Sequence, residues 1–249
     1  MFWRKKKLPQ VTFATTVWEK DWKKILESPG YLQIAQIENH QFPFAECLLV
    51  INNVKELSLV KKTACRLIDD GVLSRFVVAE EIAEEMLSFF ALKRTDFRGD
   101  DGQPSDWVYF NALGPLAAIY ECQSDYLLYH TGDVRLDQPV DWIDKAVRLM
   151  EKNPRFQVAN LMWNGKKNEV KKESYQKRRG FYFAKSGFSD QQFLVRKETF
   201  RNPIYGTIHP ESGHYPRGEV FERRAYSAMR ERGWERLIAS HGSYTHENF

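Results

Sequence analysis

Three apolar segments that each end in small polar residues constrain the fold of this chain more than any other feature. They read VTFATTV at 11–17, CLLVINNV at 47–54 and DYLLYHTGDV at 125–134. Short apolar runs rich in β-branched and aromatic residues are typical of buried strands. In open α/β sheets, ligands bind just beyond the carboxyl ends of the strands. The three endings therefore predict strands whose polar ends meet along one ligand-binding edge of a sheet.

Helical patterns separate these segments and complete a repeating order. A helix is expected at 56–70, a further strand at 75–80 and an amphipathic helix at 81–93. A polar loop at 95–106 then precedes a buried helix at 107–122. Strands and helices that alternate at these spacings form right-handed βαβ units around a mainly parallel sheet.

The second half of the chain follows a different pattern. Its expected elements are a helix at 140–154, strands at 156–164 and 191–200, a helix at 219–234 and a short final strand. A basic loop is expected at 164–180, and a long irregular segment spans 202–218. Long loops in compact domains usually have a function or are disordered, so the second segment is a candidate binding loop.

Composition limits the class of protein. The chain has 249 residues, of which 43% are hydrophobic and 14% aromatic, so disorder of the whole chain is excluded. No uninterrupted apolar window approaches the roughly 18 residues of a membrane-spanning helix. The N-terminus shows no signal-peptide pattern, and the 3 cysteines have no CxxC spacing. These features predict a soluble protein of the reducing cytoplasm.

The net charge of +4 hides an uneven distribution. Residues 4–7 are all basic, and 164–180 contains seven basic and two acidic residues, which leaves the rest of the chain near −5. Such runs are usually solvated surface. The other interpretation is contact with anionic lipid head groups or a phosphorylated substrate, which predicts a peripheral contact with an anionic membrane. No nucleic-acid-binding module is recognised, so a nucleic-acid partner is not expected.

In the order and spacing of its elements, the chain resembles glycosyltransferases of the GT-A fold, nearest in layout to the family 2 enzymes. The matching stretches are ATTVWEKDW in the first strand, LLVINNV, Asn111 in the buried helix, YLLYHTGDV, PRGEVFERR and the late SHGSYTH. The resemblance implies one GT-A (Rossmann-like) α/β domain over 1–249, with a mixed, mainly parallel central sheet flanked by helices. Residues 8–135 would bind the nucleotide sugar and 136–249 the acceptor.

The resemblance also implies roles for individual residues. A diphosphate leaving group needs its charge neutralised, commonly by Mn²⁺ or Mg²⁺, for which Asp133 and either His241 or His246 would be ligands. Glu219 would be the general base, with Glu222 as the alternative. The residues expected to contact the nucleotide or its phosphates are Thr15, Thr16, Asn52, Asn53, Asn111, Thr131 and Asp133.

The expected activity is hexosyl transfer from a nucleotide sugar to a glycan or glycolipid, as in polysaccharide biosynthesis, with inversion. One departure from the family pattern bears on it, because Thr131 replaces the first aspartate of the Asp-x-Asp motif. Three interpretations follow: a metal held by Asp133 with a histidine, phosphate held by basic residues, or an inactive relative that binds a nucleotide or a glycan. The first is favoured. A nucleotidyltransferase would usually have a glycine-rich loop after the first strand, which ATTVWEKDW lacks.

Overall fold

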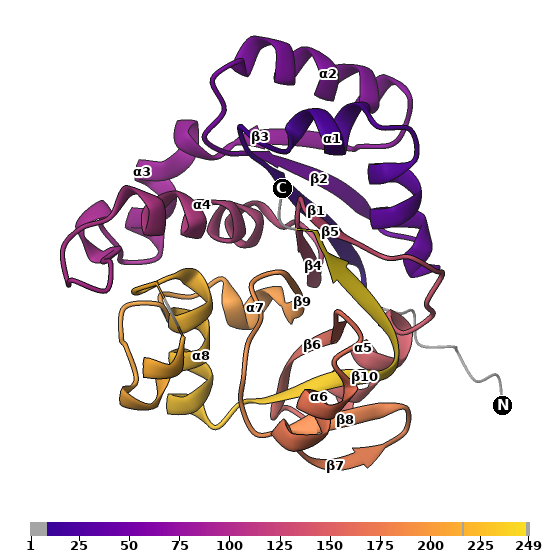
Figure 1. The fold of residues 1–249 in the computed structure, drawn as a ribbon, viewed down its shortest axis with the longest axis vertical. Helices are drawn as coiled ribbons and strands as arrows, with labels where there is room; N and C mark the ends of the chain where they lie inside the picture. Colours follow the sequence, from indigo (N-terminus) through magenta and orange to yellow (C-terminus); the bar gives the residue numbers. More distant parts are fainter. Residues whose placement is uncertain (1–8, 216, 248–249) are drawn as a thin grey trace, which may run out of the picture.

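The computed structural model describes residues 9–215 and 217–247 and contains a 10-stranded sheet in the order β3-β2-β1-β4-β9-β6-β10-β8-β7, with β5 paired to β10 (Figure 1). The strands are β1 Val11–Val17, β2 Glu46–Ile51, β3 Arg75–Val78, β4 Tyr126–Thr131, β5 Val134–Arg135, β6 Phe156–Trp163, β7 Ser174–Arg178, β8 Phe181–Ala184, β9 Gln192–Arg196 and β10 Glu235–His246. The prediction of a mixed α/β sheet is confirmed.

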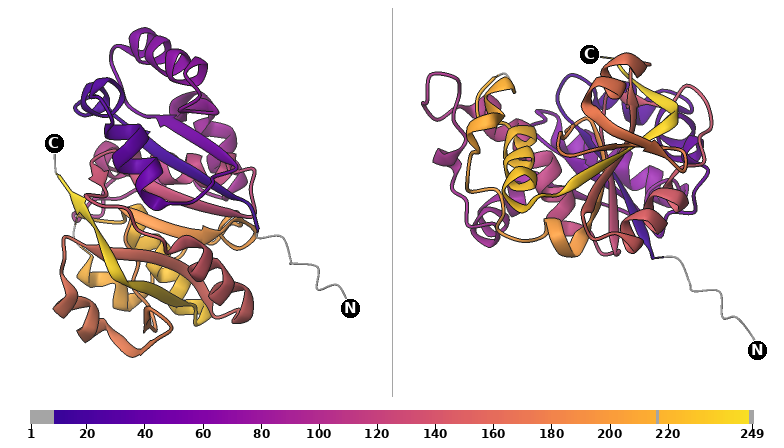
Figure 2. Two further views of the ribbon diagram at one scale, coloured as in Figure 1. Left: turned by 90° about the vertical axis from the view of Figure 1, so that its right-hand side faces the viewer. Right: turned by 90° about the horizontal axis from the view of Figure 1, so that it is seen from below.

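Helices cover both faces of this sheet (Figure 2). The α-helices are α1 Trp22–Glu27, α2 Leu57–Asp69, α3 Ala79–Phe89, α4 Asp106–Glu121, α5 Ile143–Lys152, α6 Lys167–Glu173, α7 Lys197–Phe200 and α8 Phe221–Arg232. Apolar residues of α1, α2 and α5 pack in one core cluster, and those of α3, α4 and α8 pack in a second. Within the described part of the chain, no helix has both the length and the apolar content that crossing a bilayer requires.

The first half of the fold is the parallel part of the sheet. Strand β1 pairs in parallel with β2 and with β4, and β2 pairs in parallel with β3. Parallel neighbours end on the same side of a sheet, so the polar ends of β1, β2 and β4 do lie along one edge, as the sequence predicts. Strand β3 ends at Val78 rather than at residue 80, because Glu80 and Glu81 already belong to the first turn of α3, where acidic residues are favourable.

The basic segment 164–180 is not a loop, which corrects the sequence-based expectation. It contains α6 and β7, and β7 pairs with β8 as an antiparallel hairpin. Arg179 and Gly180 form the turn with φ of 53° and 84°, and positive φ at both central residues suits the twist of a tight hairpin. The apolar run of β8 is buried throughout, so this edge of the sheet is anchored in the core.

The short final strand of the prediction is in fact β10, which has 12 residues. It pairs with β8 over residues 236–239 and with β6 from Glu235 to Tyr244, and its last two residues pair with β5. Gly242 (φ 79°) lies against Val140 at a point where a side chain would collide, so the strand bends there at a glycine. The length of β10 is functionally relevant because it carries the chain end back to the carboxyl end of β4.

Candidate functional site

The turn after β4 is held tightly against β1. A Cβ atom at Gly132 would collide with Ile25 Cδ1 and with the backbone oxygen of Thr16, so only glycine allows this approach. Thr131 Oγ1 donates to Asp133 Oδ1 at 2.8 Å. The residue that replaces the first acid of the motif therefore orients the carboxylate of the second.

Asp133 meets His246 from the other end of the chain. His246 pairs with Val134 in the β5–β10 ladder, and the backbone N–H of Glu247 donates to the backbone oxygen of Asp133 at 2.9 Å. These backbone contacts bring His246 Nε2 to 2.8 Å from Asp133 Oδ2. Burial lowers the pKa of His246, but the hydrogen bond and charge of Asp133 outweigh it, so the pKa is raised above its ordinary value.

The other candidate histidine lies elsewhere on β10. His241 is exposed, and its Nε2 faces the backbone oxygen of Asp141 at 3.2 Å. The structure therefore brings His246 to Asp133 and leaves His241 on the surface.

The ligand atoms of the Asp133–His246 pair, a carboxylate oxygen and an imidazole nitrogen, are of the kinds that bind divalent cations. Carboxylate oxygen suits both Mg²⁺ and Mn²⁺, and Mn²⁺ also accepts imidazole nitrogen. Among the described residues, no group of three or more His, Cys, Asp or Glu side chains could hold a metal ion. Two protein ligands leave most coordination positions open, and phosphate oxygens of a nucleotide are suitable ligands for them.

The threonines of β1 have mainly structural contacts. Thr15 is fully buried, and its hydroxyl has no hydrogen-bond partner among the described residues. Thr16 Oγ1 lies 2.8 Å from the hydroxyl of Tyr129. Direct contact between a nucleotide and Thr15 would require a rearrangement of the strand, so Thr15 is a poor candidate for that role.

The asparagines at the end of β2 and in α4 lie near one another. Asn52 Nδ2 donates to the backbone oxygen of Phe110 at 2.8 Å, next to Asn111. In the described part of the chain, the amide oxygens of Asn52 and Asn111 are buried without partners. Asn53 is exposed in a left-handed conformation (φ 52°), with its N–H on Glu80. Two unpaired acceptors beside the strand ends are consistent with a ligand that supplies N–H or O–H donors.

Not every polar residue of the segment 125–134 lies at this edge. His130 is fully buried on the other side of β4, with its Nε2 3.0 Å from Nε2 of His40. Trp142 Nε1 donates to His40 Nδ1 at 3.0 Å. Burial lowers the pKa of His40 to about 3, so this pair of imidazoles is neutral and belongs to the core.

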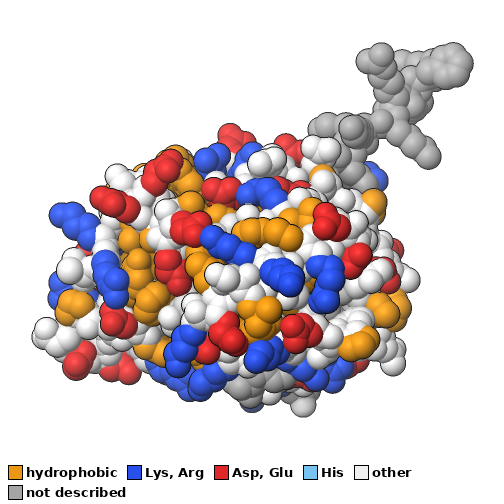
Figure 3. Space-filling view, turned by 90° about the horizontal axis from the view of Figure 1, so that it is seen from above, with side chains coloured by type: hydrophobic (Ala, Val, Ile, Leu, Met, Phe, Trp, Pro, Cys, Tyr) orange, Lys and Arg blue, Asp and Glu red, His pale blue; other side chains and the backbone are white. Residues whose placement is uncertain are grey.

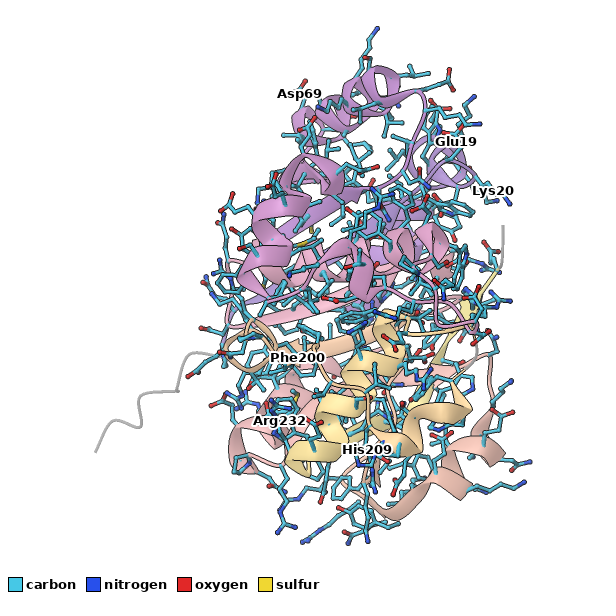
Figure 4. All side chains as sticks on the ribbon, turned by 90° about the vertical axis from the view of Figure 1, so that its left-hand side faces the viewer. Glu19, Lys20, Asp69, Phe200, His209 and Arg232 are labelled. Atoms are coloured by element: carbon cyan, nitrogen blue, oxygen red, sulfur yellow. The ribbon has the colours of Figure 1, made fainter. Side chains whose placement is uncertain are left out.

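A cavity of about 560 Å³ lies between the β8–β9 loop, the end of β6 and the segments η4 (Pro210–His214) and α8. Figure 4 shows His209, which precedes η4, and Arg232, which ends α8, in the half of the molecule opposite Asp69. The cavity is lined by Trp163, Glu173, Ser186, Gly187, Phe188, Ser189, Gln191, His214, Tyr215, Glu222, Tyr226 and Arg236.

Glu222 is the predicted base that lies in this cavity. Helix α8 begins at Phe221, so Glu222 is in its first turn, where the helix dipole favours an ionised carboxylate. Burial, followed by the nearby charge of Asp190, raises the pKa of Glu222 well above its ordinary value. A carboxyl with a raised pKa is a stronger proton acceptor once it is ionised.

Glu219, the first choice from the sequence, is engaged elsewhere. Its Oε2 accepts from the buried guanidinium of Arg224 at 2.8 Å, and its N–H donates to the backbone oxygen of Arg98. Because the sequence pattern predicts a helix that begins at residue 219, Glu219 was expected to be the carboxylate at the N-terminus of that helix. The true start lies two residues later, so Glu222 occupies that position and Glu219 neutralises Arg224.

The loop between β8 and β9 contains functional candidates that the sequence reasoning missed. Asp190 lies beside Glu222, and burial raises the pKa of Asp190 to about 6. Gln191 lines the cavity, and its Nε2 lies 3.1 Å from His246 Nδ1. The sequence signal, a short SGFSDQQ stretch between two apolar strands, is that of an ordinary turn.

The comparisons with known proteins concern the fold. No protein-family model and no curated protein matches the chain. A crystal structure of GalNAc-T7 with UDP, GalNAc and Mn²⁺ superposes with a TM-score of 0.58 at 10% identity, over 97% of this chain and 44% of that one. A mannosyltransferase from Pyrobaculum calidifontis in complex with GDP-Man and Mn²⁺ gives 0.59 at 11%, over 97% and 57%. The chain has the GT-A fold.

The GT-A resemblance drawn from the sequence is thus confirmed at the level of fold. This GT-A chain spans about half the length of the two solved structures. Both of those neighbours are glycosyltransferases whose structures contain Mn²⁺ and a nucleotide or nucleotide sugar. At this level of identity, the likeness carries no information about which residues act.

Proposed function

We propose that the chain is a glycosyltransferase that moves a sugar from a nucleotide-sugar donor to a glycan or glycolipid acceptor, with inversion. The observation that carries the proposal is the continuity of the site. Gln191 lines the cavity that contains Glu222, and its side chain contacts His246, which pairs with Asp133. The candidate base and the two candidate metal ligands therefore border one loop, an arrangement suited to a displacement at a sugar carbon.

The donor side is assigned to the Asp133–His246 pair. Asp133 would hold a divalent cation through a carboxylate oxygen and His246 through Nε2, and Thr131 would orient the carboxylate. The cation, when bound, neutralises the charge that develops on the departing diphosphate. The buried amide oxygens of Asn52 and Asn111 mark where the nucleoside is expected.

The acceptor side is assigned to the cavity. Glu222 accepts the proton of the acceptor hydroxyl as that oxygen attacks the sugar carbon. The aromatic rings of Trp163, Tyr215 and Tyr226 line the same space and are suited to packing against a sugar ring.

The membrane interpretation stays a prediction for the basic residues of α6 and β7. Glu173 ends α6 and lines the cavity, so this basic segment borders the acceptor side. On the face shown in Figure 3, by contrast, acidic and basic side chains are interspersed. The basic residues 4–7 lie outside the described part of the chain. A glycolipid acceptor at an anionic surface would suit this arrangement.

A thermal-shift screen with UDP, GDP, CDP and dTDP, each with and without Mn²⁺, tests the donor site. Asp133→Ala is compared with Asp144→Ala, a control on α5 whose carboxylate pairs with Arg148. One nucleotide at about 100 times its Kd should stabilise the wild type by about 2.7 kcal/mol in a Mn²⁺-dependent manner. The effect should vanish in Asp133→Ala and persist in Asp144→Ala.

Two other outcomes discriminate among the alternatives. No stabilisation by any nucleotide, with or without Mn²⁺, would contradict the proposal. Stabilisation without release of nucleoside diphosphate from the corresponding nucleotide sugars, in the presence of a panel of glycan acceptors, would instead identify an inactive relative that only binds.

A further inference from the structure

A continuous chain of side chains links the cavity to the Asp133–His246 pair. Ser189 Oγ lies 3.1 Å from the hydroxyl of Tyr244, which donates to Gln191 Oε1 at 3.2 Å. Gln191 Nε2 lies 3.1 Å from Nδ1 of His246, whose Nε2 faces Asp133. Tyr244 is fully buried, so water cannot readily replace this link.

At a pH where the His246 imidazole is neutral, these hydrogen bonds favour one of its two tautomers. An amide nitrogen can only donate, so His246 Nδ1 accepts from Gln191, and a neutral imidazole then carries its proton on Nε2. That proton is donated to Asp133. The Tyr244 hydroxyl gives its proton to Gln191 Oε1, so its oxygen accepts from Ser189.

A metal ligand needs the opposite tautomer. With a divalent cation on Nε2, the neutral imidazole must carry its proton on Nδ1, and this N–H requires an acceptor. Only the Oε1 atom of the Gln191 amide can accept, so the amide must turn over and present its nitrogen to Tyr244. The Tyr244 hydroxyl then accepts from the amide and donates to Ser189.

We propose that Gln191 is the positioning residue for His246, and that its amide couples cation binding at His246 to the cavity through Tyr244 and Ser189. The inference rests on the proposed function, because it takes the Asp133–His246 pair as the cation site. Without the cation, the Ser189 hydroxyl proton is engaged by Tyr244. With the cation bound, the same proton is free to donate to a hydroxyl of an acceptor beside Glu222.

This coupling has a direction that chemistry explains. Cation binding frees the Ser189 hydroxyl to donate a hydrogen bond in the cavity. The sugar acceptor should therefore bind more tightly after the nucleotide sugar and the cation have bound. By thermodynamic linkage, a sugar acceptor that accepts a hydrogen bond from Ser189 must also increase the affinity for the cation. This hydrogen-bonded relay, from His246 through Gln191 and Tyr244 to Ser189, thus favours an order in which the nucleotide-sugar site is filled first.

Two substitutions at Gln191 separate a positioning role from a merely steric one. Gln191→Met keeps the approximate shape and removes the acceptor, so Mn²⁺ affinity, measured by electron paramagnetic resonance, should fall by about 10- to 100-fold. Gln191→Glu supplies an acceptor oxygen without a turn of the amide and should restore affinity to within a few-fold. Gln176→Met, an exposed glutamine of β7, is the control.

Nuclear magnetic resonance of labelled protein reads the relay itself. Addition of Zn²⁺, a diamagnetic cation that binds imidazole nitrogen, with UDP or GDP should move the His246 proton from Nε2 to Nδ1 in ¹⁵N spectra, with His246→Gln used for assignment. The ¹³Cζ resonance of Tyr244, assigned with Tyr244→Phe, should shift in the wild type as its hydroxyl changes partner. That shift should be absent in Gln191→Met.

The outcomes are distinguishable. Unchanged Mn²⁺ affinity in Gln191→Met, or a His246 proton that stays on Nε2 at saturating Zn²⁺, overturns the relay and leaves the proposed function in place. A wild-type protein that binds no Mn²⁺ with either nucleotide overturns both. Loss of affinity in Gln191→Met with recovery in Gln191→Glu, together with the tyrosine shift, supports the relay.

Discussion

The two halves of the molecule use their polar residues differently. In the parallel half, polar side chains at the strand ends are buried and largely hold elements together, as Thr16 does with Tyr129 and Asn52 with α4. In the second half, Gln191, Glu222 and His246 line or border one cavity and one candidate cation site. The regular half supplies a scaffold, and the irregular half supplies most of the groups suited to chemistry.

The largest predicted effect is on the rate of sugar transfer when Glu222 is replaced. Glu222→Gln should lower the rate of sugar transfer by about 10²- to 10⁴-fold, the usual contribution of a general base. Glu219→Gln should leave the rate within a few-fold but destabilise the fold, because Arg224 loses its charged partner. Initial rates and urea unfolding of both variants provide the measurements. A larger rate loss in Glu219→Gln would reverse the assignment.

A second effect tests the parallel half through Asp21, the N-cap residue of α1. Burial raises the pKa of Asp21 to about 8, whereas an unfolded aspartate titrates near 3.8. The folded protein therefore holds an extra proton between these values, and Asp21 costs stability as pH rises through this window. Asp21→Asn should gain stability over the wild type by about 1.4 kcal/mol per pH unit from about pH 5 to 8.

Urea unfolding at pH 5, 6, 7 and 8 measures that gain as a difference between the two proteins. The difference cancels other groups that titrate in the same range, such as the buried pair His40 and His130. A difference that does not change with pH would show that Asp21 titrates normally.

A third effect concerns the turn that joins the halves. Gly132→Ala should destabilise the protein by about 3 kcal/mol, the upper end for overpacking, because the added methyl group meets the backbone of β1. Gly206→Ala is the matched control, since its Cβ would have open space. Equal unfolding midpoints for the two variants would contradict tight packing of Gly132 against the backbone of β1.

The smallest predicted effect separates the two histidines of β10. His246→Gln should weaken Mn²⁺ binding in the presence of nucleotide by at least about tenfold, and His241→Gln should leave it unchanged. Isothermal titration calorimetry with the nucleotide identified by thermal shift gives both values. If His241→Gln had the larger effect, the assigned donor site would be wrong.

Local sequence patterns were sufficient to predict most helices and strands and the class of fold. Helix α2 spans Leu57–Asp69 against an expected 56–70, and α4 spans Asp106–Glu121 against 107–122, because helical periodicity and breaker residues are read within one segment. The polar ends of β1, β2 and β4 were also predicted to meet, since parallel order follows from the βαβ alternation.

Which of the candidate residues lie together depends on long-range packing. The choice of His246 over His241 depends on the β5–β10 register, and the choice of Glu222 over Glu219 depends on a helix start two residues later than expected. Gln191 entered the site through contacts with β10, far away in the chain. Strand register and side-chain direction are set by non-local packing, and local patterns carry no record of it.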